Sequence, residues 1–141
     1  MFGSFSNRAS AYAQVGVETG VGAADPHKLI LMLFDGAILS ITTASAAMGN
    51  NDIPAKGHAI SKAIEIIVNG LKASLDEDAG GDLASRLAAL YDYMSERLLY
   101  ANLHNSRATL DEVSELLNTL REAWESISPA PTASVAVQRP L

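Results

Sequence analysis

Cysteine is absent from the 141 residues, so the chain has no disulfide framework and no thiol chemistry. Aromatic residues make up only 6% of the sequence, so a core must be built mostly from aliphatic side chains. Charged residues make up 18% and hydrophobic residues 48%, a balance too apolar for a chain disordered throughout. The formal net charge is −6, which argues against nucleic acid and anionic membranes because both attract clustered Lys and Arg.

Targeting signals are also missing from the sequence. The first residues, MFGSFSNRASAYAQ, lack the basic region, apolar region and cleavage site of a secretory signal peptide. The longest purely apolar run in the first expected helix, Leu29 to Phe34, is far shorter than the ~20 residues that span a membrane. We therefore expect no direct membrane insertion, and the lack of cysteine fits a reducing cytosol.

Motifs for catalysis and cofactor binding are absent as well. A di-metal site in a helical bundle would need Glu-x-x-His pairs, but His27, His58 and His104 each have alanine three residues earlier. No HExxH, phosphate-binding loop or dinucleotide fingerprint occurs. We therefore predict no enzyme activity, no cofactor and no metal.

The clearest helix signal begins at Asp25, in the run DPHKLILMLFDGAI. Asp25 can cap free backbone N–H groups, and Pro26 suits the first helical turn. Apolar side chains then recur at alternating steps of four and three, the spacing of one helical face. They are Ile30, Phe34, Ala37, Ile41, Ala44 and Met48. The sequence therefore predicts a helix over about 26–48.

Similar periodic stripes predict three more helices, over about 54–75, 82–103 and 107–127. The run Asp76 to Gly81 is expected to be a turn. The last helix is expected to start at a capping box of Thr109 and Glu112, or alternatively at Ser106. Short connections between helices of similar length predict an all-α fold, an antiparallel up-and-down four-helix bundle over residues 25–127.

The two ends of the chain carry no sustained period. Residues 1–24 contain four glycines and are expected to be a flexible segment. Tyr12 and Val15 are apolar points on it, so this segment is either a frayed terminus or a light, displaceable cover on the bundle. Residues 128–141 contain Pro129, Pro131 and Pro140 and are expected to be a disordered tail.

The outer faces of the helices differ in composition. The fourth helix carries Asp111, Glu115 and Glu122 on its far side, as expected for a solvated face. The far sides of the first two helices carry small or apolar residues instead. They are Leu29, Met32, Gly36, Leu39, Thr43 and Ala47 in the first, and Ala59, Ile66, Gly70 and Ala73 in the second. A helix that is apolar on two sides is covered on both or presents one side to a partner, which includes a second copy of the chain.

Several segments together resemble the bacterial flagellar secretion chaperone that serves flagellin. They are AYAQV (11–15), DPHKLILMLFDGAI (25–38), AKGHAISKAIEII (55–67), NGLKASLD (69–76), LYDYMSERLLYAN (90–102) and EVSELLNTLREAW (112–124). The resemblance covers about residues 11–127. It implies a cytoplasmic, ATP-independent export chaperone that binds the C-terminal region of flagellin, prevents premature polymerisation and contacts export gate components. An anti-sigma factor is a further implied partner.

The outer faces then suggest which residues touch the partner. We expect Leu29, Met32 and Leu39 of the first helix and Ile66 of the second to contact flagellin, with Tyr12 and Val15 as displaceable cover. The alternative for Leu29 and Met32 is burial under the N-terminal segment alone. Alternative functions are a regulatory adaptor holding an anti-sigma factor and a self-associating structural bundle.

Overall fold

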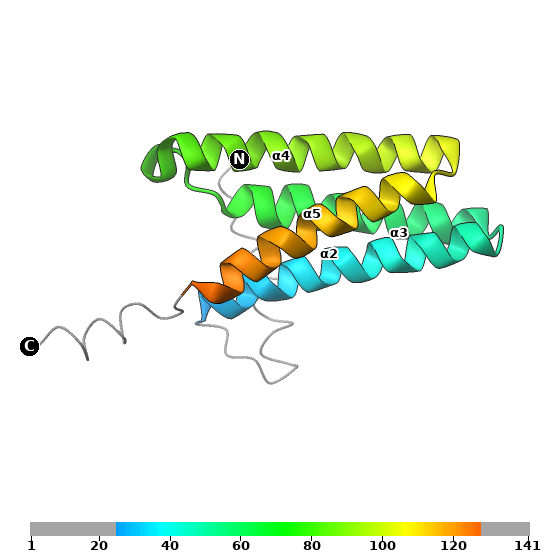
Figure 1. Cartoon of the computed structure of the whole chain (residues 1–141), viewed down its shortest axis with the longest axis horizontal. Coiled ribbons are helices and arrows are strands. Elements are labelled where there is room, and N and C mark those ends of the chain that lie inside the picture. The colour runs from blue at the N-terminus through cyan, green and yellow to red at the C-terminus, as the bar shows by residue number, and fades with distance from the viewer. Residues whose placement is uncertain (1–24, 128–141) are drawn as a thin grey trace, which may run out of the picture.

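The computed structural model describes residues 25–127, which form four antiparallel helical segments (Figure 1). They are α2 (Pro26–Gly49), α3 (Ile53–Glu65), α4 (Glu77–His104) and α5 (Arg107–Ser126), with a π-helical segment η1 (Ile66–Leu71) and a 3-10 turn η2 (Lys72–Ser74) continuing α3. Residues 25–127 contain no strand. The predicted all-α four-helix bundle is confirmed, and the expected flexible segment 1–24 and tail 128–141 lie outside the described residues.

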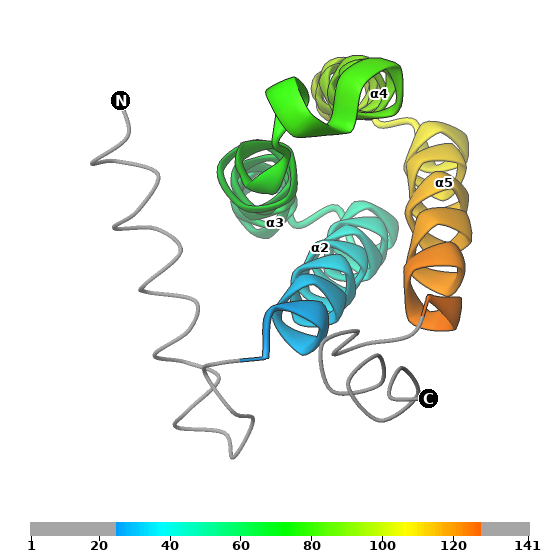
Figure 2. The same ribbon diagram turned by 90° about the vertical axis from the view of Figure 1, so that its left-hand side faces the viewer.

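Seen down the bundle, the helices occupy four corners (Figure 2). α2 packs against α3 and α5, and α4 packs against the same two helices, so α2 and α4 lie at diagonal corners. α5 starts at the C-terminal end of α4 and slants across the bundle to end beside the N-terminus of α2 (Figure 1). The outer sides of α2 and α4 therefore belong to separate faces of the molecule.

The α2–α3 interface is built on small residues that let the two backbones approach closely. Ala37 and Ala44 of α2 and Ala59 and Ala63 of α3 are all buried. A Cβ added at Gly70 would lie 3.1 Å from the Leu33 Cδ2 atom. Larger aliphatic side chains from all four segments, including Ile60, Ile67, Met94, Leu98, Leu110 and Leu117, fill the centre of the bundle.

Each helix begins at a side-chain cap of the same type. Asp25, Asp52 and Asp76 accept hydrogen bonds from the backbone N–H three residues on, at 3.2, 3.2 and 3.1 Å. Ser106 caps α5 in the same way, at 3.1 Å from the Thr109 N–H. The Thr109–Glu112 capping box is therefore wrong and the alternative start at Ser106 is correct, because the Glu112 carboxylate is engaged by Arg97 instead.

The corner between α3 and α4 also departs from the sequence prediction. The expected helix over 54–75 changes to π-helical winding at Ile66. The expected turn over 76–81 contains the first helical turn of α4, which breaks at Gly81 (φ 57°, ψ −135°). A π-helical segment inserts extra residues per turn, so it rotates every later side chain relative to the α-helical register.

Candidate functional site

An apolar strip runs along the outer side of α2, and we call Leu29, Met32, Gly36, Leu39 and Thr43 the α2 outer strip. Leu39 is 66% exposed. Leu29, Met32 and Gly36 are partly buried, and Thr43 is exposed. Three of the four predicted contact residues, Leu29, Met32 and Leu39, therefore lie together on one partly accessible face.

The fourth predicted contact residue, Ile66, does not lie on that face. It is 5% exposed and belongs to the core cluster, with its Cδ1 atom 3.4 Å from where a Cβ on Gly36 would lie. The placement of Ile66 on an outer surface is therefore wrong. The physical reason is that Ile66 faces α2 at the start of the π-helical segment. Ala59, Gly70 and Ala47, assigned to the same outer sides, are also buried.

The two residues expected to form a displaceable cover, Tyr12 and Val15, lie outside the described residues. Their role stays a prediction.

A second group of exposed apolar side chains lies near the C-terminal end of α4. Leu103 is 80% exposed and Leu99 is 58% exposed, and Tyr100 is exposed beside them. The contact residues predicted from the sequence include none on α4. The sequence signal for this group was that Leu99 and Leu103 are four residues apart on an otherwise polar side of the helix. Because α4 is diagonal to α2, this group does not extend the α2 outer strip.

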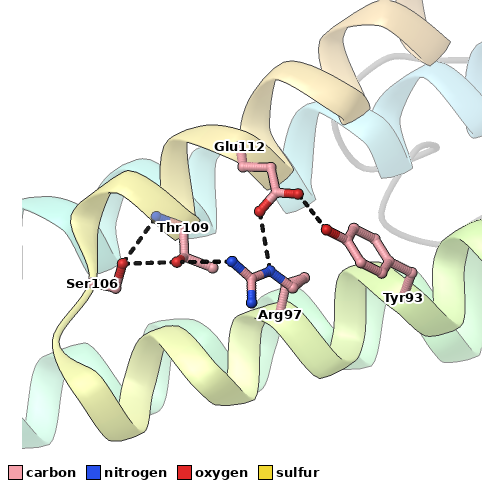
Figure 3. A network of polar contacts seen from close by, with 5 residues as sticks. All are labelled: Tyr93, Arg97, Ser106, Thr109 and Glu112. Carbon is pink, nitrogen blue, oxygen red and sulfur yellow. Dashed lines mark hydrogen bonds and ion pairs between the residues drawn. The ribbon is translucent and has the colours of Figure 1, made fainter.

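A polar network joins α4 to α5 across their shared end (Figure 3). The Arg97 Nε–H donates to Glu112 Oε1 at 3.1 Å, and the Tyr93 hydroxyl donates to the other Glu112 oxygen. Arg97 also reaches Thr109 Oγ1 at 3.4 Å, and Thr109 contacts Ser106. The Tyr93 hydrogen bond and then the one from Arg97 hold the pKa of Glu112 below its usual value, and the pKa of Tyr93 is raised by the same contact.

Lys56 forms a second clamp at the same end of α4. Its side chain is 7% exposed, and Nζ donates to the Asn102 carbonyl at 2.9 Å and to Asn105 Oδ1 at 2.6 Å. Both acceptors lie at the C-terminal end of α4, where the unpaired carbonyls favour a cation. Asn105 has the left-handed conformation (φ 50°) that ends the helix. This cluster therefore ties the start of α3 to the end of α4.

The described residues offer little for chemistry. Within residues 25–127 no three His, Asp or Glu side chains come close enough to hold a metal ion. The arrangement consists of apolar surface and interhelical clamps, which suits binding of another chain.

One helix is also apolar enough to raise the question of a membrane. By length and composition alone, α2 could span one, but the core helix of a soluble protein passes the same test. Here α2 packs against α3 and α5, and its exposed Asp35 pairs with Arg121 at 2.6 Å. The expectation of no membrane insertion considered only the run Leu29–Phe34 and stays a prediction.

Comparison with known proteins gives a consistent result. The family model described as "Flagellar protein FliS" matches residues 8–131. The chain is 54% identical to the flagellar secretion chaperone FliS of Salmonella typhimurium over 119 residues, 84% of this chain and 88% of the relative. It is 44% identical to that of Escherichia coli, over 86% and 90% of the two chains. It is 45% identical to FliSB of Pseudomonas aeruginosa, over 83% and 92%. The resemblance noted in the sequence is confirmed: the chain belongs to the FliS family of flagellar secretion chaperones.

Proposed function

We propose that this chaperone binds the C-terminal helical region of flagellin in the bacterial cytoplasm. Binding keeps subunits from polymerising before export and supports their delivery to the flagellar export gate. The observation that carries the proposal is the α2 outer strip, where Leu39 is 66% exposed beside Leu29 and Met32 on a helix of a secretion chaperone. No covalent step, metal or cofactor is needed for this function.

The physical basis is burial of apolar surface in a groove or strip by an amphipathic helix. Burying about 1,000 Å² of apolar surface would contribute on the order of 25 kcal/mol before costs. Ordering a disordered partner segment offsets much of that gain, so net binding stays reversible. Reversibility is required because the chaperone must release its substrate for export.

Isothermal titration calorimetry with the C-terminal segment of flagellin from the same organism tests the proposal. We expect one-to-one binding with a negative heat-capacity change, the mark of apolar burial. Leu39→Asp is expected to weaken binding at least about tenfold. Leu39 is a sharper probe than Met32 because its exposure lets a charge be introduced without disturbing the core. Thr119→Asp, also exposed but on α5, is the matched control and is expected to bind normally.

Each of three results would overturn part of this assignment. A folded, monomeric chain that does not bind flagellin would move the regulatory adaptor, holding an anti-sigma factor, to the front. A closed oligomer in light scattering that dissociates in the Leu39→Asp variant would show that the α2 outer strip is covered by a second copy of the chain. Normal binding by Leu39→Asp, with an unchanged circular dichroism spectrum, would place the flagellin contact elsewhere.

A further inference from the structure

The two ends of α4 are held very differently. At its C-terminal end, Lys56 bonds to Asn102 and Asn105, and Arg97 bonds to Glu112 and Thr109. The buried side chains of this half include Met94 and Leu98, both 0% exposed. This half of α4 is therefore fixed to both α3 and α5.

The first part of α4 after the break, residues 82–90, has no comparable anchor. Its only buried side chains are Ala84 and Ala88, which remove little apolar area from water. Leu83 is 68% exposed, and Leu87 and Leu90 pack against the core but are only partly buried. The nearest ion pair, Lys72 with Asp92 at 2.8 Å, has both side chains partly in solvent, where such pairs contribute little. α5 also slants away from this part of α4 (Figure 1).

The backbone leading into residues 82–90 is irregular. Gly81 adopts φ 57° and ψ −135°, a conformation open essentially to glycine alone. A Cβ on the preceding Gly80 would lie 2.6 Å from the Ala84 Cβ, so this position also requires glycine. The π-helical segment and the 3-10 turn come just before, over residues 66–74. Regular α-helical hydrogen bonding therefore does not continue from α3 into residues 82–90, and it does not hold these residues in place.

We propose that residues 82–90 form an arm that opens by local unfolding, starting at the Gly80–Gly81 hinge and ending before Tyr91, while residues 91–104 stay clamped. The arm opens as a separate cooperative unit, below the free energy of global unfolding. Its opening uncovers Leu87, Leu90 and the core surface beneath them. An amphipathic segment of the export substrate would bind to that surface. This binding rests on the proposed function, whereas the opening itself does not.

Hydrogen–deuterium exchange of the full chain without substrate tests the opening. The backbone amides of residues 86–90 are compared with those of residues 94–101. Amides 111–115 of α5 are the matched control, because they lie equally far from a helix start but at the clamped end. After correction for intrinsic rates, we expect residues 86–90 to exchange at least about tenfold faster than both other sets. Equal protection of all three sets would overturn the proposal, whether or not flagellin binds.

Two glycine variants test the hinge separately. Gly81→Ala strains the break, and we expect faster exchange in residues 86–90 with rates in residues 94–101 unchanged within about twofold. Gly57→Ala is the control because a Cβ there meets nothing within 4 Å, and it should leave residues 86–90 unchanged. An equal rise along all of α4 in Gly81→Ala would show that α4 opens only with the whole bundle. If Gly81→Ala does not fold, the exchange pattern of the wild-type chain decides.

Discussion

His27 and Trp124 join the first turn of α2 to the last turn of α5 through two reciprocal hydrogen bonds. The Trp124 indole N–H donates to the His27 carbonyl at 2.9 Å, and His27 Nε2 donates to the Trp124 carbonyl at 2.8 Å. The two rings also stack, with centroids 5.1 Å apart. Because α5 slants across the bundle, this pair joins α5 to α2 at the end of the bundle opposite the Lys56 clamp.

The Trp124 hydrogen bond is expected to stabilise the fold. Trp124→Phe keeps a ring for stacking but removes the indole N–H that donates to the part-buried His27 carbonyl. We expect the free energy of unfolding to fall by about 1–2 kcal/mol. Urea unfolding measures the change in free energy. It is followed by circular dichroism, because the variant lacks the chain's single tryptophan and therefore has no tryptophan fluorescence to record. An unchanged midpoint would mean that water replaces the indole N–H without cost.

The Lys56 clamp should contribute more than an ordinary surface lysine. Lys56→Met keeps the apolar stem and removes the ammonium that bonds to Asn102 and Asn105. We expect a loss of about 1–3 kcal/mol in unfolding free energy, because hydrogen bonds from a charged group are strong and the acceptors lose their partner. Lys62→Met, at an exposed position of the same helix, is the control and should change stability by under about 0.5 kcal/mol. Equal effects in the two variants would contradict a role for the clamp.

The network around Glu112 should make stability depend on pH. Its pKa in the folded chain lies below the ordinary value of 4.5, first because the Tyr93 hydroxyl bonds to the carboxylate and then because Arg97 does. The folded state therefore favours the charged carboxylate, and this stabilisation is present above the unfolded pKa and lost as the pH falls through the folded one. We expect Glu112→Gln to lower Tm at about pH 6 and to have little effect at about pH 3. Thermal melts at both pH values measure this, with Glu115→Gln as control. A constant difference in Tm would contradict the carboxylate's role.

Truncation of two neighbouring leucines of α4 should lower stability by very different amounts. Leu98 is 0% exposed and Leu99 is 58% exposed. Leu98→Ala should cost about 2–5 kcal/mol of unfolding free energy because it leaves a cavity among core side chains. Leu99→Ala should cost less than about 1 kcal/mol. Urea titrations of the two variants measure the two losses of unfolding free energy. Similar losses would mean that α4 packs a different side against the core.

The candidate site was only partly predictable from the sequence. Leu39 was identifiable because it lies on the far side of a strongly periodic helix, and the structure leaves it exposed. Ile66 was misplaced because α3 lies between α2 and α4, so the side taken as its outer face is covered by α2. Leu99 and Leu103 lie opposite the apolar stripe of α4, so the sequence spacing already indicated their exposure, but they were not selected as contact residues.

The sequence by itself determined the number of helices, most of their ends and the family. These features are local: Asp25 and Asp52 cap their own helices, and the apolar spacing within each segment defines one buried face. The tertiary structure alone decided that Lys56 is buried against the end of α4 and that His27 meets Trp124. Those outcomes join residues far apart in the chain or depend on how neighbouring helices cross, and the sequence periodicity of one helix does not specify either.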